Sequence, residues 1–566
     1  MVKSGLLCVL LLCAESLAAQ RFSVVITELM ADPVPSVGLP AEEYIELTNV
    51  SGRLIDLSRW RLTNGRTTGQ FPDSVFLYPD SILILCANRA YPYFQPYGRV
   101  IILDRFPVIS NSGDTLVLQD ANLETVHAVA WHPSLLPEGK NDGGWSLEMV
   151  NKNLPCSFRQ NWKASENTSG GTPGKPNSLD TATAVVTVSL LVHAHCPDPY
   201  RVVLEFDDAI DPNAAGNISL YESDLAPVIV SAKAIPPLFH QVELQLADSL
   251  KKGNIHWLSA AKVPACDLHP SGATRRVKVG LPAERPEGLV INELMNNPPA
   301  GGADYVELFN AGSAAVNLQQ LSFGNRNSRG EIASVKQLAT TPRYLFPGDY
   351  IALTTDPGWL QHQYHTIDPF ALLQSGSLPS WPDQRGHVLL LNQDNQVMDE
   401  LPYDESWHFE LVRNQEGVAL ERTDPAKNTS ERTNWHSAAM HAGYGTPGYK
   451  NSQSLEGSGK PAAVWLEAPY FSPDGDGQNE SCNIQYRFPV PGYVCSIRIY
   501  DRTGQPVRNL VSNGLCGTAG QFAWDGRNDG GKLLPASIYI LVTETFHLSG
   551  KTKRYRIPVT LARPFR

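Results

Sequence analysis

Short apolar stretches separated by turn-forming residues dominate this chain. In Glu43–Asn49, Ile45 and Leu47 alternate with Tyr44 and Glu46, which is the period of a strand with two distinct faces. Runs such as SILILCA and DTLVLQD are bounded by Asp, Asn, Gly and Pro, residues that favour turns. No long stretch has the period of a helix. The pattern therefore predicts an all-β fold made of β-sandwiches.

The same series of segments occurs twice. Val24–Pro33 recurs as Leu289–Pro298, and Glu43–Asn49 recurs as Asp304–Asn310. Towards the end of each copy, NWKASENTSGGTPGKPNS recurs as NWHSAAMHAGYGTPGYKNS. The spacing between matched segments drifts while their order is kept, so we expect two copies of one domain that differ in their loops.

The first residues have the features of a secretory signal peptide. Lys3 precedes the apolar run Leu6–Leu12, and the small residues of Ser16–Ala19 suit cleavage. We predict that residues 1–19 are removed and that the protein is secreted or lies at the cell surface. Cys13 follows the bulky Leu12, which disfavours lipidation, and no later segment approaches the ~18 apolar residues of a spanning helix.

Charge and cysteine content limit the partners and the cross-links. The net charge of −11 argues against nucleic acid as a partner, and the one dense basic run, KTKRYR, is interpreted as a solvated strand face. Nine cysteines fall to seven without Cys8 and Cys13, so at least one thiol stays unpaired within a monomer. Cys196 with Cys266 is the preferred disulfide pair.

Both copies resemble lamin-tail domains. The first copy shows the strand ending at Glu28, the EYIELTN strand and Asp56–Trp60 in the place of the family's third strand, and Gly171–Gly174 supplies the closing G-T-P-G. The second copy closes with Gly445–Gly448 but has no counterpart of Trp60. The resemblance implies an immunoglobulin-like sandwich over residues 20–176 and again over 286–450. Bacterial lamin-tail domains usually occur in secreted or surface proteins.

The segment between the copies, residues 184–281, resembles bacterial Ig-like domains of surface-layer type, which act as spacers. The matching residues are Phe206, Ile210, Asp211, Pro212, Leu244, Leu246, Leu250 and Gly253.

After a linker at 451–464, residues 465–566 resemble the flagellar hook-cap Ig-like domain and gliding-motility-associated C-terminal domains. In many relatives this terminal domain is a secretion or surface-attachment signal. The resemblances together imply four Ig-like modules in series after the signal peptide. The matching residues of the last module are Phe471, Pro473, Asp474, Gly475, Asp476, Gly477, Asn479, Tyr500, Asp501, Gly504, Val507, Trp524, Asp525, Gly526, Gly530, Pro535 and Tyr539, whereas Ser537 stands where the family has glycine.

The acidic stretch Phe471–Glu480 allows two interpretations. Asp474, Asp476, Asn479 and Glu480 offer the oxygen ligands that calcium prefers, but the spacing does not fit an EF-hand loop. The leading interpretation is a glycine-rich turn whose side chains bind their own backbone. Calcium is the only ion or cofactor that the sequence suggests.

Catalytic signals are weak. Glu28 and Glu46 recur as Glu293 and Glu307, and we expect structural carboxylates rather than an acid–base pair. The histidines of HQYHTID, His362–Asp368, match aromatic residues in the other copy and are interpreted as packing or surface residues. No hydrolase, zinc-protease or nucleotide-binding motif occurs.

The sequence thus predicts a non-catalytic modular protein with a structural or adhesive role. Its partners would be envelope or extracellular polymers and proteins, with secretion machinery acting on the last module. A binder of glycan or released DNA and a hydrolase at Glu28 and Glu46 are the alternatives.

Overall fold

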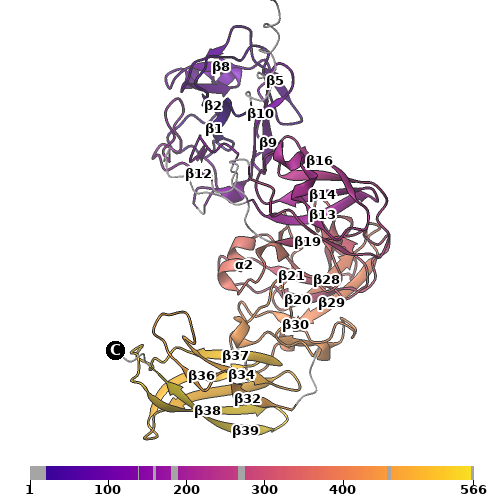
Figure 1. The fold of residues 1–566 in the computed structure, drawn as a ribbon, viewed down its shortest axis with the longest axis vertical. Helices are drawn as coiled ribbons and strands as arrows, with labels where there is room; N and C mark the ends of the chain where they lie inside the picture. The colour runs from indigo at the N-terminus through magenta and orange to yellow at the C-terminus, as the bar shows by residue number, and fades with distance from the viewer. Residues whose placement is uncertain are drawn as a thin grey trace, which may run out of the picture. The chain divides into compact units, whose positions relative to one another are not determined.

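A computed structural model describes residues 21–137, 139–156, 161–179, 189–265, 275–455 and 461–562. The predicted signal peptide and Cys266 lie outside these residues. The chain divides into two compact units, Met1–Val279 and Gly280–Arg566, and strands dominate both, which confirms the all-β prediction (Figure 1). Within the described residues, no helix is long and apolar enough to cross a membrane.

The first copy of the repeat forms two facing sheets. The first sheet has the order β12-β11-β1-β2-β7-β8, and the second has the order β10-β9-β4-β5. The short β3 and β6 pair with each other. The elements are β1 (Val24–Met30), β2 (Tyr44–Asn49), β3 (Ile55–Asp56), β4 (Arg61–Thr63), β5 (Thr68–Gln70), β6 (Phe76–Leu77), β7 (Ile82–Cys86), η1 (Asn88–Ala90), α1 (Tyr91–Phe94), β8 (Val100–Ile102), β9 (Asp114–Gln119), β10 (Thr125–Trp131), η2 (Pro133–Leu135), β11 (Leu147–Met149) and β12 (Trp162–Ala164).

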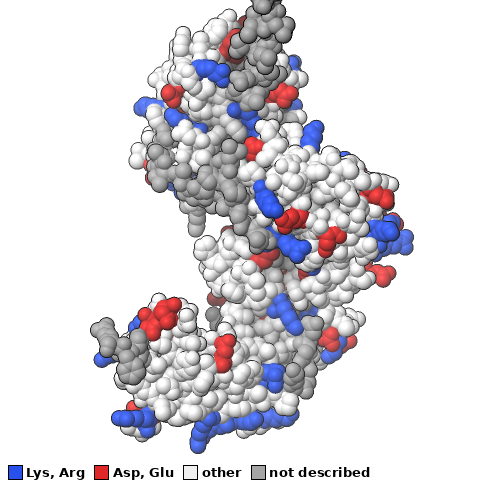
Figure 2. All heavy atoms as spheres, in the orientation of Figure 1, with Lys and Arg blue, Asp and Glu red and all other residues white. Residues whose placement is uncertain are grey.

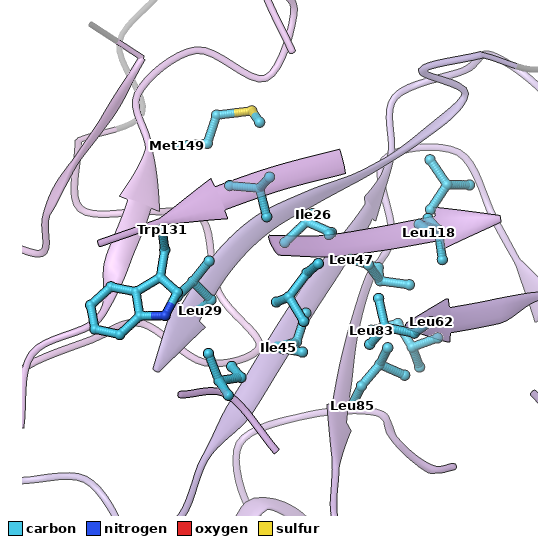
Figure 3. Packing of buried hydrophobic residues seen from close by; sticks show 14 of the residues in the cluster. Ile26, Leu29, Ile45, Leu47, Leu62, Leu83, Leu85, Leu118, Trp131 and Met149 are labelled. Atoms are coloured by element: carbon cyan, nitrogen blue, oxygen red, sulfur yellow. The ribbon is translucent and has the colours of Figure 1, made fainter. Parts of the chain in front are cut away.

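The apolar core lies between these sheets. Ile45 and Leu47 of β2 point into it together with Ile26 and Leu29 of β1 (Figure 3). The opposite face of β2 is also covered, because Tyr44 packs against Phe94 with ring centroids 5.1 Å apart. The predicted alternation is therefore confirmed, but neither face of β2 meets solvent. Every polar side chain on the second face must find its partner inside the protein.

The rest of the first unit is a smaller sandwich. One sheet has the order β13-β14-β17-β16 and the other β15-β18-β19. The apolar residues that carry the Ig-like resemblance are core residues: Phe206, Ile210, Leu244, Leu246 and Leu250 are all buried. The elements are β13 (Leu191–Asp198), β14 (Arg201–Phe206), η3 (Ala214–Gly216), η4 (Ile218–Leu220), β15 (Glu222–Ser223), β16 (Ile229–Ile235), β17 (Gln241–Leu246), β18 (His256–Ser259) and β19 (Arg276–Val279).

The second unit opens with the second copy, whose topology repeats that of the first. Its large sheet has the order β27-β26-β21-β20-β30-β31, and its edge strand β27 is parallel to β26, as β8 is to β7. The elements are β20 (Leu289–Met295), β21 (Tyr305–Asn310), β22 (Val316–Asn317), η5 (Leu318–Gln320), β23 (Ser322–Arg326), β24 (Ile332–Gln337), β25 (Tyr344–Leu345), β26 (Tyr350–Thr354), α2 (Pro357–Gln363), η6 (Pro369–Ala371), β27 (Leu372–Gln374), β28 (Arg385–Leu391), β29 (Val397–Asp404), η7 (Glu405–Trp407), β30 (Leu420–Arg422), η8 (Arg432–Asn434), β31 (Trp435–Ser437) and η9 (Met440–Ala442).

The second copy has a leucine where the first copy has Trp60. Leu321 takes the backbone position of Trp60. The Trp60 carbonyl accepts the N–H of Phe71, and the Leu321 carbonyl accepts the N–H of Leu338 in the same way. The core of this copy contains a tryptophan from another segment, Trp381, which is buried and contacts Phe323 edge-on at 5.7 Å.

The last sandwich combines the sheets β32-β34-β37 and β33-β39-β38-β35-β36. Trp524 is fully buried and lies between Phe471 and Tyr539, with ring centroids 5.1 and 5.3 Å away. The elements are β32 (Ala463–Leu466), β33 (Tyr470–Phe471), β34 (Cys482–Arg487), β35 (Tyr493–Tyr500), β36 (Pro506–Leu515), β37 (Ala519–Trp524), β38 (Ser537–His547) and β39 (Thr552–Leu561).

Thr552–Arg556 of the basic run KTKRYR form the first half of β39, a half that no strand covers on one side. On one side β39 pairs with β38 along its length, whereas on the other side β33 pairs only with Thr560 and Leu561. Basic side chains gather along this edge in the space-filling view (Figure 2). Lysine, arginine and proline on an open edge block pairing with another chain, and Pro558 adds to the block.

We predict that removing this protection causes self-association. The variant Lys553→Thr, Arg556→Thr, Pro558→Thr should form oligomers with an increased β-sheet signal, because the edge then offers free N–H groups without charge repulsion. Light scattering at constant ionic strength measures the change. A control that removes the same charge at exposed loop positions, Arg502→Thr with Lys532→Thr, should stay monodisperse, and equal aggregation of both variants would contradict the interpretation.

Candidate functional site

Three glutamates meet on the covered face of the large sheet in the first copy. Glu28 of β1 lies opposite Glu46 of β2 and opposite Glu148 of β11. A β-bulge between Ile26 and Glu28 shifts the register, and the N–H of Ile26 is donated to His127 Nδ1 at 3.1 Å. The bulge turns Glu28 to the same face as Glu46. We call Glu28, Glu46 and Glu148 the first triad.

The first triad fastens the segment that carries G-T-P-G. Glu28 Oε1 accepts the N–H of Thr172 at 2.8 Å, and Glu46 Oε2 accepts the N–H of Gly174 at 2.8 Å. Glu148 Oε2 accepts both the N–H and the hydroxyl of Ser178 at 2.7 Å. We call residues 171–178 the first strap, because they cross three strands and are held by all three carboxylates.

The remaining carboxylate oxygens of the first triad also have donors. Glu28 Oε1 accepts from the hydroxyls of Tyr44 and Ser146, both at 2.6 Å. The Thr172 hydroxyl lies 3.2 Å from Glu28 Oε2 and 3.0 Å from Glu148 Oε1, and Glu46 Oε1 accepts from Thr27 at 3.1 Å. Each of the six oxygens therefore lies within hydrogen-bonding distance of a protein group, and Glu28 Oε2 and Glu148 Oε1 share the one hydrogen of the Thr172 hydroxyl.

The second copy reproduces this arrangement with Glu293, Glu307 and Glu421, the second triad. Its strap, residues 445–453, donates the N–H of Thr446 to Glu293 at 2.9 Å and that of Gly448 to Glu307 at 2.6 Å. Glu421 accepts the hydroxyl of Ser452 at 2.8 Å and the N–H of Gln453 at 2.7 Å. The two triads differ in some donors: Asn292 donates to Glu307 where Thr27 donates to Glu46, and Ala419 stands where Ser146 donates to Glu28.

The G-T-P-G motif follows from these contacts. A Cβ on Gly171 would lie 2.5 Å from the Tyr44 hydroxyl and 2.8 Å from Glu28 Oε1, so only glycine fits beside that hydrogen bond. Thr172 supplies a backbone and a side-chain donor. Gly174 has φ of +74° and lies against the carbonyl of Tyr97, which excludes a side chain.

Burial shifts the protonation of both triads. Desolvation, followed by the nearby charge of Glu148, raises the pKa of Glu28 from 4.5 to about 7, and desolvation raises the pKa of Glu46 well above its ordinary value. In the second triad burial raises the pKa of Glu421 to about 7 and those of Glu293 and Glu307 well above 4.5. The backbone N–H donors partly oppose this shift. A carboxyl that stays protonated reduces the repulsion among the three acids of its triad.

The triads are structural rather than catalytic or metal-binding in geometry. Their side chains are 0–1% exposed and their oxygens are occupied, so no substrate atom reaches them. Among the described residues, the one group of three acidic, histidine or cysteine side chains with ligand atoms close enough for an ion is elsewhere. The prediction that Glu28 and Glu46 form a pair is thus refined, because the sequence reasoning missed Glu148 and Glu421.

That group is Asp474, Asp476 and Glu480, whose ligand oxygens lie within 4.8 Å of one another. Asp474 Oδ2 accepts the Ser472 hydroxyl at 2.6 Å, Asp476 Oδ1 accepts the N–H of Gln478 at 2.7 Å and Glu480 Oε1 accepts that of Gly477 at 2.9 Å. Asn479, the fourth predicted ligand, has φ of +50° and its carbonyl closes the turn to the N–H of Ser472 at 2.8 Å. The carboxylates thus bond their own turn.

Other residues considered from the sequence have structural roles. His362 Nδ1 contacts the Gly358 carbonyl, and Asp368 caps a short helix by accepting the N–H of Phe370. Trp162 and Trp435 are buried, so they are not stacking platforms for a sugar. Cys156 is disulfide-bonded, whereas Cys196 is not part of a disulfide, so the predicted pair Cys196–Cys266 is wrong.

A groove of about 960 Å³ lies in the second unit, beside β35, β36, β38 and β39. Glu410, Leu411 and Arg413 form one wall. Across from them the outer face of the sheet presents Phe546 and the ion pair of Arg554 with Glu544. The mixed charges of its lining select no ligand class.

We predict that Glu28→Gln changes stability in a pH-dependent way. The raised pKa of Glu28 means that its contribution to folding is complete below the unfolded pKa near 4.3 and is lost as the pH rises through about 7. Gln keeps the shape but does not titrate. The cost of the variant relative to wild type should therefore be larger at pH 5 than at pH 8, by about 2–3 kcal/mol.

Hydrogen exchange of the Thr172 and Gly174 amides measures this difference, since the ratio of variant to wild type at one pH cancels the intrinsic exchange rate. The matched control is Glu166→Gln, which changes an exposed carboxylate near the strap. Its ratio should not vary with pH. A pH-independent ratio for Glu28→Gln would show that Glu28 has an ordinary pKa.

Comparison with solved structures gives weak global similarity. The chain is 22% identical to FlgD of P. aeruginosa over 14% of its own length and 60% of that chain, with a TM-score of 0.12. The N-terminal part of the bacterial S-layer protein SbsC gives 14% identity over 29% of this chain and 45% of that chain, with a TM-score of 0.17. This chain covers less than two thirds of the length of each of these two proteins.

PorZ of Porphyromonas gingivalis, described as a bacterial surface component of the type-IX secretion system, gives 10% identity over 92% of this chain and 68% of that one, with a TM-score of 0.15. Scores this low carry no argument about function. A comparison with curated proteins found no match.

The family comparison matches both copies of the repeat. The model described as Lamin Tail Domain covers residues 18–133 and 282–405, together less than half of the chain. Each matched segment contains the first two glutamates of its triad but ends before Glu148 or Glu421. The resemblance of both copies to lamin-tail domains, stated from their strand motifs, is confirmed for these two segments.

Proposed function

We propose that this chain is a non-catalytic structural protein of the cell surface or extracellular space, in which sandwich modules act in series as spacer and adhesive elements. The observation that carries the proposal is how the repeat uses its recurring polar residues. In both copies they lie buried and hold a strap, and none of those residues faces a solvent cleft. The two copies therefore share the buried hydrogen bonds between the triad and the strap, rather than an exposed site.

The connection between neighbouring modules supports a mechanical role. The second strap continues into contacts with the last module, where the N–H of Thr518 is donated to the Ser452 carbonyl at 2.9 Å and Gln453 Nε2 to that of Cys516 at 3.2 Å. Gly517 allows this approach, because a Cβ there would lie 2.3 Å from the Ser452 carbonyl. A strap that closes one module and docks the next transmits force between them.

We further propose that residues 465–566 direct secretion or surface attachment. This module contains twelve Lys and Arg and eight Asp and Glu, so its net charge is positive, whereas the whole chain has a net charge of −11. This opposite charge gives the last module a surface chemistry distinct from the modules before it.

Removal of the last module tests this role. In a Bacteroidota host, a chain ending at residue 464 should accumulate inside the envelope, while the full chain reaches the surface or the medium. Fractionation with protease accessibility of intact cells measures the distribution. The full-length variant Arg502→Thr with Lys532→Thr controls for expression and charge. Normal export of the truncated chain would remove the proposed role without affecting the structural one.

For the acidic turn of Asp474, Asp476, Asn479 and Glu480, we propose a turn-forming role and keep calcium as the alternative. The carboxylates already accept hydrogen bonds from the turn itself, which supports the first role. The close approach of one carboxylate oxygen each from Asp474, Asp476 and Glu480, within 4.8 Å of one another, supports the second.

We predict that calcium leaves stability nearly unchanged. With a dissociation constant above about 10 mM, 1 mM calcium adds less than about 0.1 kcal/mol, so melting curves of the full chain in calcium and in chelator should coincide. The double variant Asp474→Asn, Asp476→Asn serves as the reference. A calcium-dependent rise in melting temperature that is lost in this variant would establish the ion site instead.

A further inference from the structure

Two buried cysteines of the last module lie on the same inner face of neighbouring strands. Cys495 of β35 pairs with Gly514 of β36. Two residues after Gly514, Cys516 points to the same inner face and lies opposite Tyr493, since its N–H is donated to the Tyr493 carbonyl at 2.8 Å. Cys495 and Cys516 are therefore diagonal neighbours across one ladder. Both belong to the core cluster of this module, with exposures of 3% and 0%.

The two thiols are in contact. In a regular ladder the Cα atoms of diagonal neighbours are about 7–8 Å apart, just beyond the separation of about 7 Å that a disulfide spans without backbone movement. Here the Cys516 thiol lies within hydrogen-bonding range of Cys495, and it also donates to the carbonyl of Gly514, the residue opposite Cys495, at 3.7 Å. Tyr486 belongs to the same core cluster, and burial, together with the nearby Cys516 and Cys495, raises the pKa of its hydroxyl well above the ordinary value. Both cysteines are free thiols in this structure.

We propose that Cys495 and Cys516 are a modification site that forms an intramodule disulfide when the chain folds in an oxidising compartment. The oxidant is a low-molecular-weight disulfide or the disulfide of a thiol oxidoreductase. The thiolate of one cysteine attacks it, forms a mixed disulfide and releases one thiolate. The second cysteine then attacks the mixed disulfide and releases the other. Two protons and two electrons leave the cysteines, and the oxidant becomes two thiols.

Burial decides when this exchange takes place. Thiolate is the reactive form, and desolvation raises the pKa of the Cys516 thiol well above its ordinary value. A small disulfide cannot reach either sulfur in the closed sandwich. The bond therefore forms during folding, or during an opening of β36 from β35, and is afterwards protected from reduction by the same burial.

The disulfide would act next to the contact between strap and module. The Cys516 carbonyl accepts from Gln453, and Tyr486, beside the thiols, accepts the N–H of Gly517 and contacts His441 at 2.8 Å. Cross-linking β35 to the end of β36 fixes the backbone that holds these partners. A chain under tension would then keep its junction when the last module is pulled.

Refolding of the full chain in a glutathione redox buffer tests the proposal. The expected product has lost two hydrogens in the peptide pair that contains Cys495 and Cys516, as seen by mass spectrometry without reduction. Its amides at Gly517 and Thr518 should exchange more slowly than in the reduced protein. Native protein treated with the same buffer should react much more slowly than the refolding chain.

Variants separate this bond from other cross-links. Cys495→Ala and Cys516→Ala should each abolish the linked peptide and leave hydrogen exchange insensitive to oxidant. Cys482→Ala is the matched control, because Cys482 is buried in the same module on the facing strand β34 and should leave the linkage intact. Free thiols at both positions after oxidative refolding to the native circular dichroism spectrum would overturn the proposal, as would a bond from either cysteine to Cys482.

Discussion

The hydrogen bonding of three buried carboxylates is the constraint on which each lamin-tail copy depends. A carboxylate without partners in a protein interior is costly, and leaving one unsatisfied would cost about 1–3 kcal/mol or more. In the first copy the missing donors arrive from the strap, where Thr172 and Gly174 lie more than a hundred residues along the chain from Glu28 and Glu46. Hydrogen bonds from the strap therefore complete the module, and detachment of the strap would leave all three glutamates without these donors.

The two copies show which parts of this arrangement are required. Both keep the bulge and give its N–H a side-chain acceptor, but the first uses His127 and the second uses Asp399. Burial lowers the pKa of His127 to about 4, so the ring is neutral and able to accept at Nδ1. In the second copy, Arg422 forms an ion pair with the carboxylate of Asp399, and its guanidinium also donates to the carbonyl of Ile291 at 2.8 Å. The acceptor is required, while its chemical type is not.

Much of the fold followed from local pattern, whereas the site depended on distant contacts. The alternation at Tyr44–Asn49 identified the core face, and internal repetition picked out Glu28 and Glu46 as a recurring pair. Glu148 was missed because it lies in a three-residue strand without clear alternation. Its signal was present, since Glu148 and Glu421 stand at the same distance before Trp162 and Trp435. Burial of the acids was not readable, because the covering strap comes from another part of the chain.

The end of the second copy shows how a closing strap becomes a junction. Ser178 and Ser452 occupy the same place on their glutamates, but the second strap continues with Gln453, whose side chain reaches the carbonyls of Ser437 and Cys516. The side-chain amide of Gln453 thus bonds residues of two sandwiches, while the backbone N–H of Gln453 is donated to Glu421. The segment predicted as a linker begins inside this network. Since bending there would break hydrogen bonds of both modules, separation of the two modules is coupled to loosening of the second triad.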